Sequence, residues 1–230
     1  QATTTTLKEI SVFPQPLQKP HPQLWEPLTS PRSIDWAAKH GVNGVFVVEP
    51  NDRLRRNIEL YYQAAAKYNW PDFRNRGPFR FGWDGEKRRG IVTTRYITVT
   101  PKGKEKEYKE RTGMGMELQF DYYAPFGFGA VVGRLDEPMP DLNAKVTAEM
   151  LFEREIAICG GPQEVIDKVM KIKEACGYED FCFLAWFEKG GFAEEETEAQ
   201  MQLFAEEVMP ELRRACGGGP NLPESTVELI

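Results

Sequence analysis

Two hydroxyl side chains, Thr29 and Ser30, stand where a short apolar run gives way to a helical pattern. Ser30 suits the cap position of a helix, and Pro31 suits its first turn. Free N–H groups at a helix start attract anions, and ligands in parallel α/β folds bind at the carboxyl ends of strands. The junction therefore suits a phosphate group, although spacing alone favours a plain helix cap, because caps greatly outnumber phosphate sites.

The remaining polar motifs indicate structure rather than chemistry. His21 lies between two prolines, and His40 stands at a predicted helix end. Neither histidine has a cysteine or carboxylate at metal-ligand spacing, so we expect structural roles and no metal site. The junction at 160–164 also has the pattern of a helix start. There Glu164 would repel a phosphate, so we expect only a cap.

Aromatic residues gather in two places. Segment 113–133 mixes methionines and aromatic side chains with many glycines. It suits either a mobile lid over an apolar substrate pocket or a packed excursion that covers an exposed edge. Trp186 and Phe187 stand at the carboxyl end of a predicted strand. They either line a substrate pocket or belong to the core.

Apolar runs and helical periodicity alternate along the chain. The runs predict strands at 24–28, 44–48, 90–99 and 180–187. Helices are predicted at 31–40, 52–68, 102–111, 141–154, from 162 onward and at 194–215, the last one buried through Met201, Phe204, Val208 and Leu212. This order predicts a parallel sheet with right-handed crossovers. A TIM barrel and an open doubly wound sheet both fit, and neither a Gly-x-Gly-x-x-Gly fingerprint nor a P-loop occurs.

Composition narrows the function classes. The 230 residues carry a net charge of −6 and are 41% hydrophobic, which is ordinary for a globular protein and argues against nucleic-acid binding. No apolar run approaches the roughly 20 residues of a membrane span, and the first residues lack the apolar core of a secretory signal. The spacing of the four cysteines fits neither a metal site nor a disulfide frame, so we expect reduced thiols in the cytoplasm.

Two stretches resemble the luciferase-like, flavin-dependent monooxygenases, the family of bacterial luciferase. Residues 10–46 hold a Gln-Lys-Pro-His-Pro lead, a strand, a Ser-bearing turn and a helix with Trp-Ala-Ala near its end. Residues 159–212 hold a Gly-x-Pro-x-x-Val helix start, a last strand, a Gly-Gly loop and a helix with Leu-Phe-Ala-Glu-Glu-Val-Met-Pro. Together they cover under half of the chain, and they follow the order of the family.

The resemblance implies an α/β fold that is the C-terminal part of a TIM (β/α)8 barrel. About four parallel strands with their helices would span 1–216, with a long insertion at about 100–155 and a flexible tail at 217–230. In the family, the turn after the fifth strand helps to bind the flavin phosphate. This implies cofactor contacts for Pro27, Leu28, Thr29 and Ser30.

The implied activity is that of a monooxygenase in which reduced FMN and O2 oxidise a small organic substrate. A separate reductase would supply the flavin, and FMN is favoured over the deazaflavin F420, which one branch of the family uses. The catalytic histidine of the family belongs to an N-terminal half without a counterpart here, so no catalytic residue is assigned. That half would come from a second polypeptide or an oligomer partner. Alternatives are a shortened, non-catalytic flavin-binding or structural subunit, and an F420-dependent oxidoreductase.

Overall fold

Parallel strands form one sheet in the computed structural model, which describes residues 24–68, 91–138, 145–177 and 182–216, together with 14 and 17. Within these ranges the strands are β1 (Trp25–Pro27), β2 (Asn43–Val47), β3 (Ile91–Val99), β4 (Ala157–Gly160) and β5 (Cys182–Trp186). The α-helices are α1 (Pro31–His40), α2 (Asn51–Lys67), α3 (Glu105–Tyr123), α4 (Ala148–Glu153), α5 (Pro162–Cys176), α6 (Glu194–Leu203) and α7 (Met209–Ala215). Shorter helical turns are η1 (Ala124–Phe126), η2 (Phe128–Val132) and the π-helical η3 (Phe204–Val208).

The central strand β3 organises the sheet. β2 pairs along 91–94 of β3, β5 along 92–96 and β4 along 96–99, all in parallel, while β1 pairs with β2. The residues of β3 that pair with β5 overlap those that pair with β2 and with β4. β5 therefore lies along one edge of β3, and β2 and β4 lie one after the other along the opposite edge. The four predicted strands are therefore confirmed as one parallel sheet. β4 was missed, although a short apolar run precedes the helix start at Gly161.

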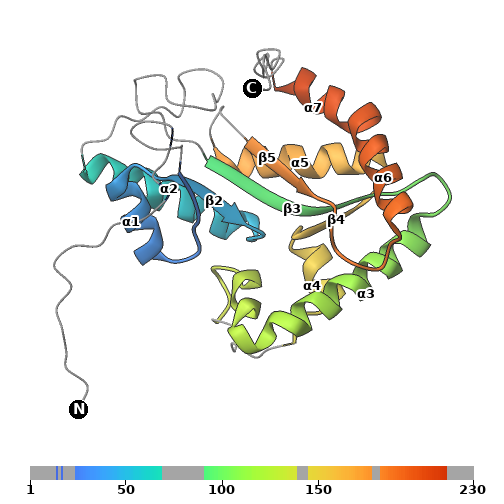
Figure 1. Ribbon diagram of the computed structural model, residues 1–230, viewed down its shortest axis with the longest axis horizontal. Coiled ribbons are helices and arrows are strands. Elements are labelled where there is room, and N and C mark those ends of the chain that lie inside the picture. The colour runs from blue at the N-terminus through green and yellow to red at the C-terminus, as the bar shows by residue number, and fades with distance from the viewer. Residues whose placement is uncertain are drawn as a thin grey trace.

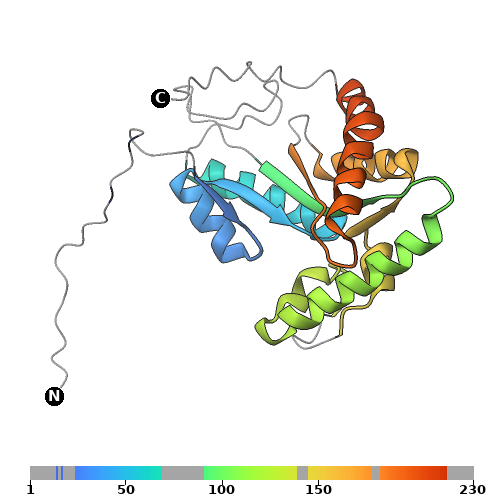
Figure 2. The same cartoon turned by 45° about the vertical axis from the view of Figure 1, so that its right-hand side comes forward.

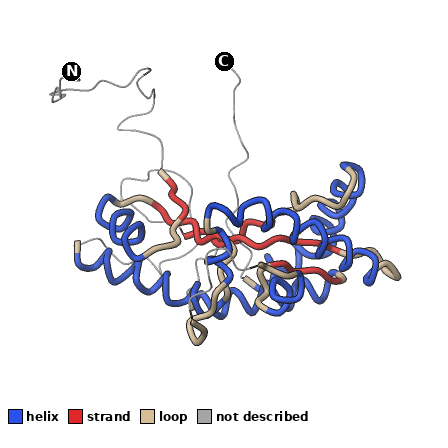
Figure 3. Tube along the Cα trace, turned by 90° about the horizontal axis from the view of Figure 1, so that it is seen from below, coloured by secondary structure: helices blue, strands red, loops and turns tan. Residues whose placement is uncertain are grey.

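The two faces of the sheet pack against different helices. On the outer face, Phe46, Ile97 and Ile158 share a core with buried side chains of α1, α2 and α5. On the inner face, Tyr96 and Trp186 belong to a second core with α3, α4 and η2. Figure 1 shows α5 and α3 on opposite sides of β3, and Figure 3 shows the strands between layers of helix. This alternation follows from the two-residue period of strand side chains.

The predicted helix starts are observed at α1 and α5, and so is the predicted end of α1 at His40. The Ser30 side chain caps α1, Pro31 is its first residue, and Gly41 ends it with a φ of 69°. Gly161 caps α5, and Gly177 ends it with a φ of 72°. Both C-terminal glycines occupy the left-handed region, which other residues adopt only at a cost in free energy.

The segment 113–133 is mostly helical and packs through one side, while Met114, Tyr122 and Phe126 on the other side are exposed. The predicted helix at 102–111 instead continues as α3 to Tyr123, and Figure 2 shows it running below the sheet. Met116 and Phe120 are buried in the inner core. The helix comes close to its neighbours because it lacks side chains at two points. A methyl group on Gly113 would lie 2.8 Å from the Ala148 side chain, and one on Gly115 would lie 2.6 Å from the Lys189 carbonyl oxygen.

The final predicted helix is observed with an internal π turn. α6, η3 and α7 follow one another without interruption, and Pro210 lies at the start of α7. Proline has no N–H for the helical ladder, which accounts for a local change of pitch before it. The change alters the buried face: Val208 is buried as predicted, whereas Met201 is 51% exposed and Gln200 is buried in its place. The predicted tail at 217–230 and His21 lie outside the described residues.

Candidate functional site at the carboxyl ends of the strands

The residues predicted to hold a phosphate leave the carboxyl end of β1. Pro27 is the last residue of the strand, and Leu28 is fully buried and donates its N–H to the Val45 carbonyl oxygen at 2.8 Å. Thr29 and Ser30 follow, and both side chains are exposed. The turn is therefore anchored through Leu28 while its two hydroxyls face outward.

Ser30 is engaged as the cap of α1. Its Oγ accepts the Ser33 N–H at 3.2 Å, and its own N–H donates to the Ser33 Oγ, also at 3.2 Å. The Ser33 hydroxyl in turn donates to the Ser30 carbonyl oxygen at 2.9 Å. The capping interpretation is thus observed directly, and Ser33 adds a third hydroxyl to the turn. That residue was not singled out in the sequence, although its spacing of three from Ser30 is that of a capping box.

The charge at the start of α1 differs from that at the other described α-helices. α1 has no acidic residue in its first turn, whereas each of the others has at least one. An acidic side chain would repel an anion at the positive end of a helix. Two exposed hydroxyls, those of Thr29 and Ser30, stand at this helix N-terminus without a carboxylate in the first turn, and such a donor set suits a phosphate monoester.

The carboxyl end of β2 holds a strained turn. Val48 has a φ of 44°, which is unusual for a β-branched residue. Glu49 comes next and is completely buried. Both of its carboxylate oxygens accept from the Asn57 Nδ2, at 2.8 and 2.9 Å. Burial raises the pKa of Glu49 from 4.5 to about 7, despite that hydrogen bond.

A buried cation lies beside this turn. Arg95 on β3 is fully buried and donates to the Asn51 Oδ1 at 3.0 Å and to the Thr94 carbonyl oxygen at 2.8 Å. Burial lowers its pKa to about 10. Asn51 also donates to the Glu155 carboxylate at 3.0 Å, and Glu155 is the other described non-glycine residue with a positive φ. Strain and buried charge therefore coincide at one place, which sequence periodicity alone did not reveal.

The two aromatic residues predicted to line a substrate pocket point to different faces. Trp186 is half-buried on the inner face and stacks on Tyr96, with ring centroids 4.8 Å apart. Phe187 packs edge-on against Phe204, 5.5 Å away, beside the outer core. Only Trp186 therefore faces the inner side of the sheet.

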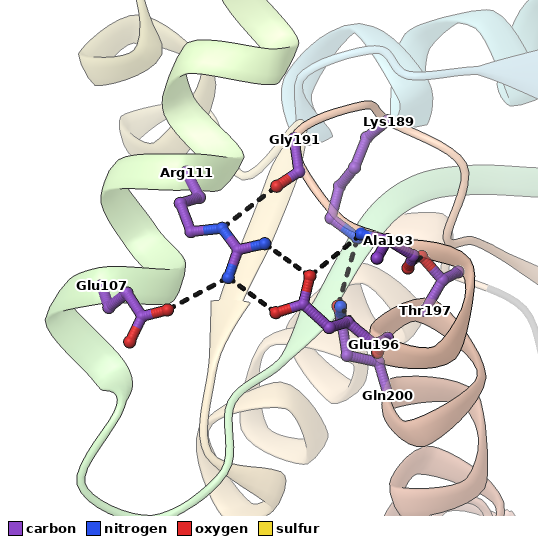
Figure 4. Close-up of polar contacts among 8 residues, drawn as sticks. All are labelled: Glu107, Arg111, Lys189, Gly191, Ala193, Glu196, Thr197 and Gln200. Atoms are coloured by element: carbon purple, nitrogen blue, oxygen red, sulfur yellow. Dashed lines mark hydrogen bonds and ion pairs between the residues drawn. The ribbon is translucent and has the colours of Figure 1, made fainter.

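Lys189 fastens the loop that follows β5 (Figure 4). It is 3% exposed, and its Nζ donates to the carbonyl oxygens of Ile97 and Phe187 at 2.7 and 3.1 Å. A third bond, 3.3 Å long, joins it to the Gln200 Oε1. All three acceptors are formally neutral, and burial lowers the pKa of the amine to about 8. The lysine thus links β3, the end of β5 and α6.

Arg111 holds the same loop from the side of α3 (Figure 4). Its Nε donates to the Gly191 carbonyl oxygen at 3.0 Å, and its terminal nitrogens form a bidentate pair with the Glu196 carboxylate. The guanidinium lowers the pKa of Glu196 to about 2 and lies 4.4 Å from the Phe192 ring centroid. The loop after β5 is therefore fixed by two cations, Lys189 of the loop itself and Arg111 of α3.

The turns after α3 are also fastened, which favours the packed interpretation of 113–133 over a mobile lid. Arg53 donates to the carbonyl oxygens of Ala130 and Gly133 at 2.6 and 3.2 Å. The Asp52 carboxylate accepts the Leu135 N–H at 2.7 Å. These contacts tie η2 and its exit to the first turn of α2.

The described part of the chain was also compared with the requirements of metal sites, membrane spans and disulfides. No group of three or more His, Cys, Asp or Glu side chains is arranged to hold a metal ion there. No described helix is both long and apolar enough to cross a bilayer. All four cysteines lie within the described ranges, and each is a free thiol.

Comparison with known proteins gives a consistent result. No family model matches the chain. The oxygenase component of flavin-dependent trigonelline monooxygenase from Acinetobacter baylyi is 24% identical over 205 residues, which are 86% of this chain and 50% of that protein. The chain therefore spans about half the length of this curated relative.

Solved structures agree on the fold. The monooxygenase RslO1 from Streptomyces bottropensis superposes with a TM-score of 0.57 at 20% identity, over 92% of this chain and 54% of that one. The oxygenating constituent of 3,6-diketocamphane monooxygenase from Pseudomonas putida, in complex with FMN, gives 0.58 at 18% identity, over 84% and 49%. The resemblance predicted from the sequence is thus confirmed: the chain is similar, over about half of their length, to flavin-dependent monooxygenases of the luciferase-like type, and it has the parallel α/β fold expected of part of their barrel.

Proposed function

We propose that this chain is part of a flavin-dependent monooxygenase that uses reduced FMN and O2 to oxidise a small organic substrate. The observation that carries the proposal is the start of α1, which combines exposed hydroxyls with a complete absence of first-turn carboxylates at the carboxyl edge of the sheet. The similarity to the oxygenase component of trigonelline monooxygenase supports the reaction class. That relative is an oxygenase component, which supports a separate reductase as the partner of this chain.

The residues of this chain would bind and orient the flavin. Thr29 and Ser30 would donate hydroxyl hydrogen bonds to its phosphate, Ser33 would hold the turn through its bonds to Ser30, and the positive end of α1 would favour the negative charge. Leu28 would keep the turn in place through its bond to β2. Bound reduced FMN would supply the chemistry that activates O2. Trp186, on the inner face, would contact the organic substrate or the ring system.

The rest of the barrel is part of the proposal. β1 pairs with β2 alone, and β5 pairs with β3 alone, among the described strands. An N-terminal half, on a second polypeptide or an oligomer partner, would pair with β1 and β5 and supply the catalytic histidine of the family. Four free thiols favour a reducing compartment such as the cytoplasm.

FMN binding to the chain tests the phosphate site. Fluorescence titration with FMN and with riboflavin, which lacks the phosphate, should show tighter binding of FMN. Ser30→Gly should remove about 10-fold or more of that preference, as expected for a lost hydrogen bond to a charged group. Glycine is tolerated at a cap, so the helix itself should persist. Thr147→Gly, at the cap of α4, is the matched control and should leave the preference unchanged.

Each alternative predicts a different result. Equal affinities for FMN and riboflavin would refute the phosphate site. Tighter binding of F420 than of FMN would favour an F420-dependent oxidoreductase. FMN binding without turnover, after reconstitution with an N-terminal half and a reductase, would favour a non-catalytic flavin-binding subunit.

A further inference from the structure

The inner face of the sheet is more accessible than the outer face. On β2, Val45 and Val47 are half-buried, whereas Phe46 between them is fully buried. Leu184 on β5 is 52% exposed, although it stands in register with Thr94 on the central strand. The described helices of the inner layer cover the carboxyl half of β3. They leave the neighbouring surface of Val45, Val47 and Leu184, here called the open region, partly uncovered. It is an apolar surface that a ligand can contact.

An aromatic pair and an amide border this open region. Tyr96 and Trp186 stand opposite each other in register on β3 and β5 and stack with a 25° angle between their planes. Gln119 on α3 donates from Nε2 to the Tyr96 hydroxyl oxygen at 3.1 Å. Burial raises the pKa of Tyr96 to about 12, so the phenol stays protonated at neutral pH. The amide is thus held against a neutral hydroxyl by one hydrogen bond.

Two polar atoms on this face lack partners among the described residues. They are the Gln119 Oε1 and the Thr94 Oγ1, both shielded from solvent. A buried polar atom without a hydrogen bond costs about 1–3 kcal/mol, so such atoms commonly mark the place of a ligand or an ordered water. Gln119 as a whole is half-buried, so part of its side chain remains open to solvent.

We propose that Gln119 is a specificity-determining residue, and that the inner face beside Trp186 binds a planar ring that carries a hydrogen-bond donor. Trp186 and Leu184 supply apolar contact for the ring, and the Gln119 Oε1 accepts from its O–H or N–H group. The inference rests on the proposed function, because it names the substrate class of that monooxygenase. It assigns selection of the substrate partly to α3, an element of the predicted insertion.

A matched pair of probes tests the donor requirement. 2-Naphthol and 2-methoxynaphthalene share one ring system, and only 2-naphthol has an O–H donor. Calorimetric titration of the chain should show 2-naphthol binding about 10-fold more tightly, the factor expected for one net hydrogen bond. Gln119→Met should abolish the difference while retaining binding of both rings. Gln202→Met, on the exposed face of α6, should leave it unchanged.

A second variant guards against a folding defect in the first. Tyr96→Phe removes the hydroxyl that holds the amide and should reduce the probe preference by several-fold while Gln119 is intact. Equal affinity of the native chain for both probes, failure of both to bind, or an undiminished preference in Gln119→Met would each overturn the inference. FMN titration of the same samples separates the two proposals. Probe selectivity without FMN binding would refute the flavin proposal alone.

Discussion

Glu49 should make the stability of this protein fall as the pH rises from about 5 to 7. Its pKa is raised from 4.5 to about 7 in the folded chain, so the folded state retains a proton that the unfolded state has already lost. The free energy of unfolding therefore decreases as the pH rises through this window and levels off above it. At roughly 1.4 kcal/mol for each tenfold change in proton affinity, the full effect is about 3 kcal/mol.

Glu49→Gln should remove most of this pH dependence. A neutral amide can still accept from Asn57, and it does not lose solvation of a charge at high pH. The gain at pH 8 should be smaller than the full 3 kcal/mol, because an amide retains only one of the two oxygens that accept from Asn57. We expect a variant about 1–2 kcal/mol more stable than the native chain at pH 8.

Urea unfolding between pH 4.5 and pH 8 measures the effect. Glu59→Gln on α2, where the exposed side chain accepts from Gln63, is the matched control and should retain the native slope. An unchanged slope in Glu49→Gln would refute the assignment to this carboxyl. Lower stability than the native chain at pH 8 would show that the attraction to Arg95 outweighs the burial of charge.

Three further outcomes concern the fixed loop after β5. Gly115→Ala should lower the melting temperature, with a cost of about 1–3 kcal/mol, because its methyl group would meet backbone oxygens, whereas Gly161→Ala has open space and should change little. Lys189 has a folded pKa of about 8 against 10.5 unfolded, so stability should rise between pH 8 and 10.5, and Lys189→Met should abolish that rise in urea unfolding. Arg111→Lys should cost about 1 kcal/mol by losing the bidentate pair, and added salt should reduce the difference; an undiminished difference at 1 M salt would contradict an ionic origin.

The sequence predicted the sheet well because strand and helix signals were local. The β-branched run at 90–99 and the caps at Ser30 and Gly161 each indicated an element that is observed. β4 was missed because four buried residues give too short a run to separate from a loop. α3 was cut short because glycine lowers helix propensity, and here tertiary packing against Ala148 and the loop after β5 overrides it.

The polar sites were harder to predict, because they depend on contacts distant in sequence. The bonds from Arg95 to Asn51 and from Lys189 to Ile97 join residues 44 and 92 positions apart. In the sequence, a lone arginine within a strand or a lysine before two glycines does not indicate which distant residue it will contact. By contrast, the start of α1 was found because Thr29, Ser30 and Pro31 are adjacent.

The unequal faces of the sheet also limit how the proposed enzyme can be completed. The outer face is closed by helices of this chain, so an added half cannot pack there without displacing α1, α2 or α5. The inner face retains half-buried valines and the exposed Leu184, and burial of such surface stabilises association by about 25 cal/mol per Å2. A completing half should therefore protect Leu184 while leaving Trp36, on the exposed side of α1, as accessible as before. Cysteine substitutions at these two positions, compared by thiol labelling with and without the added half, would distinguish barrel completion from association through the outer helices.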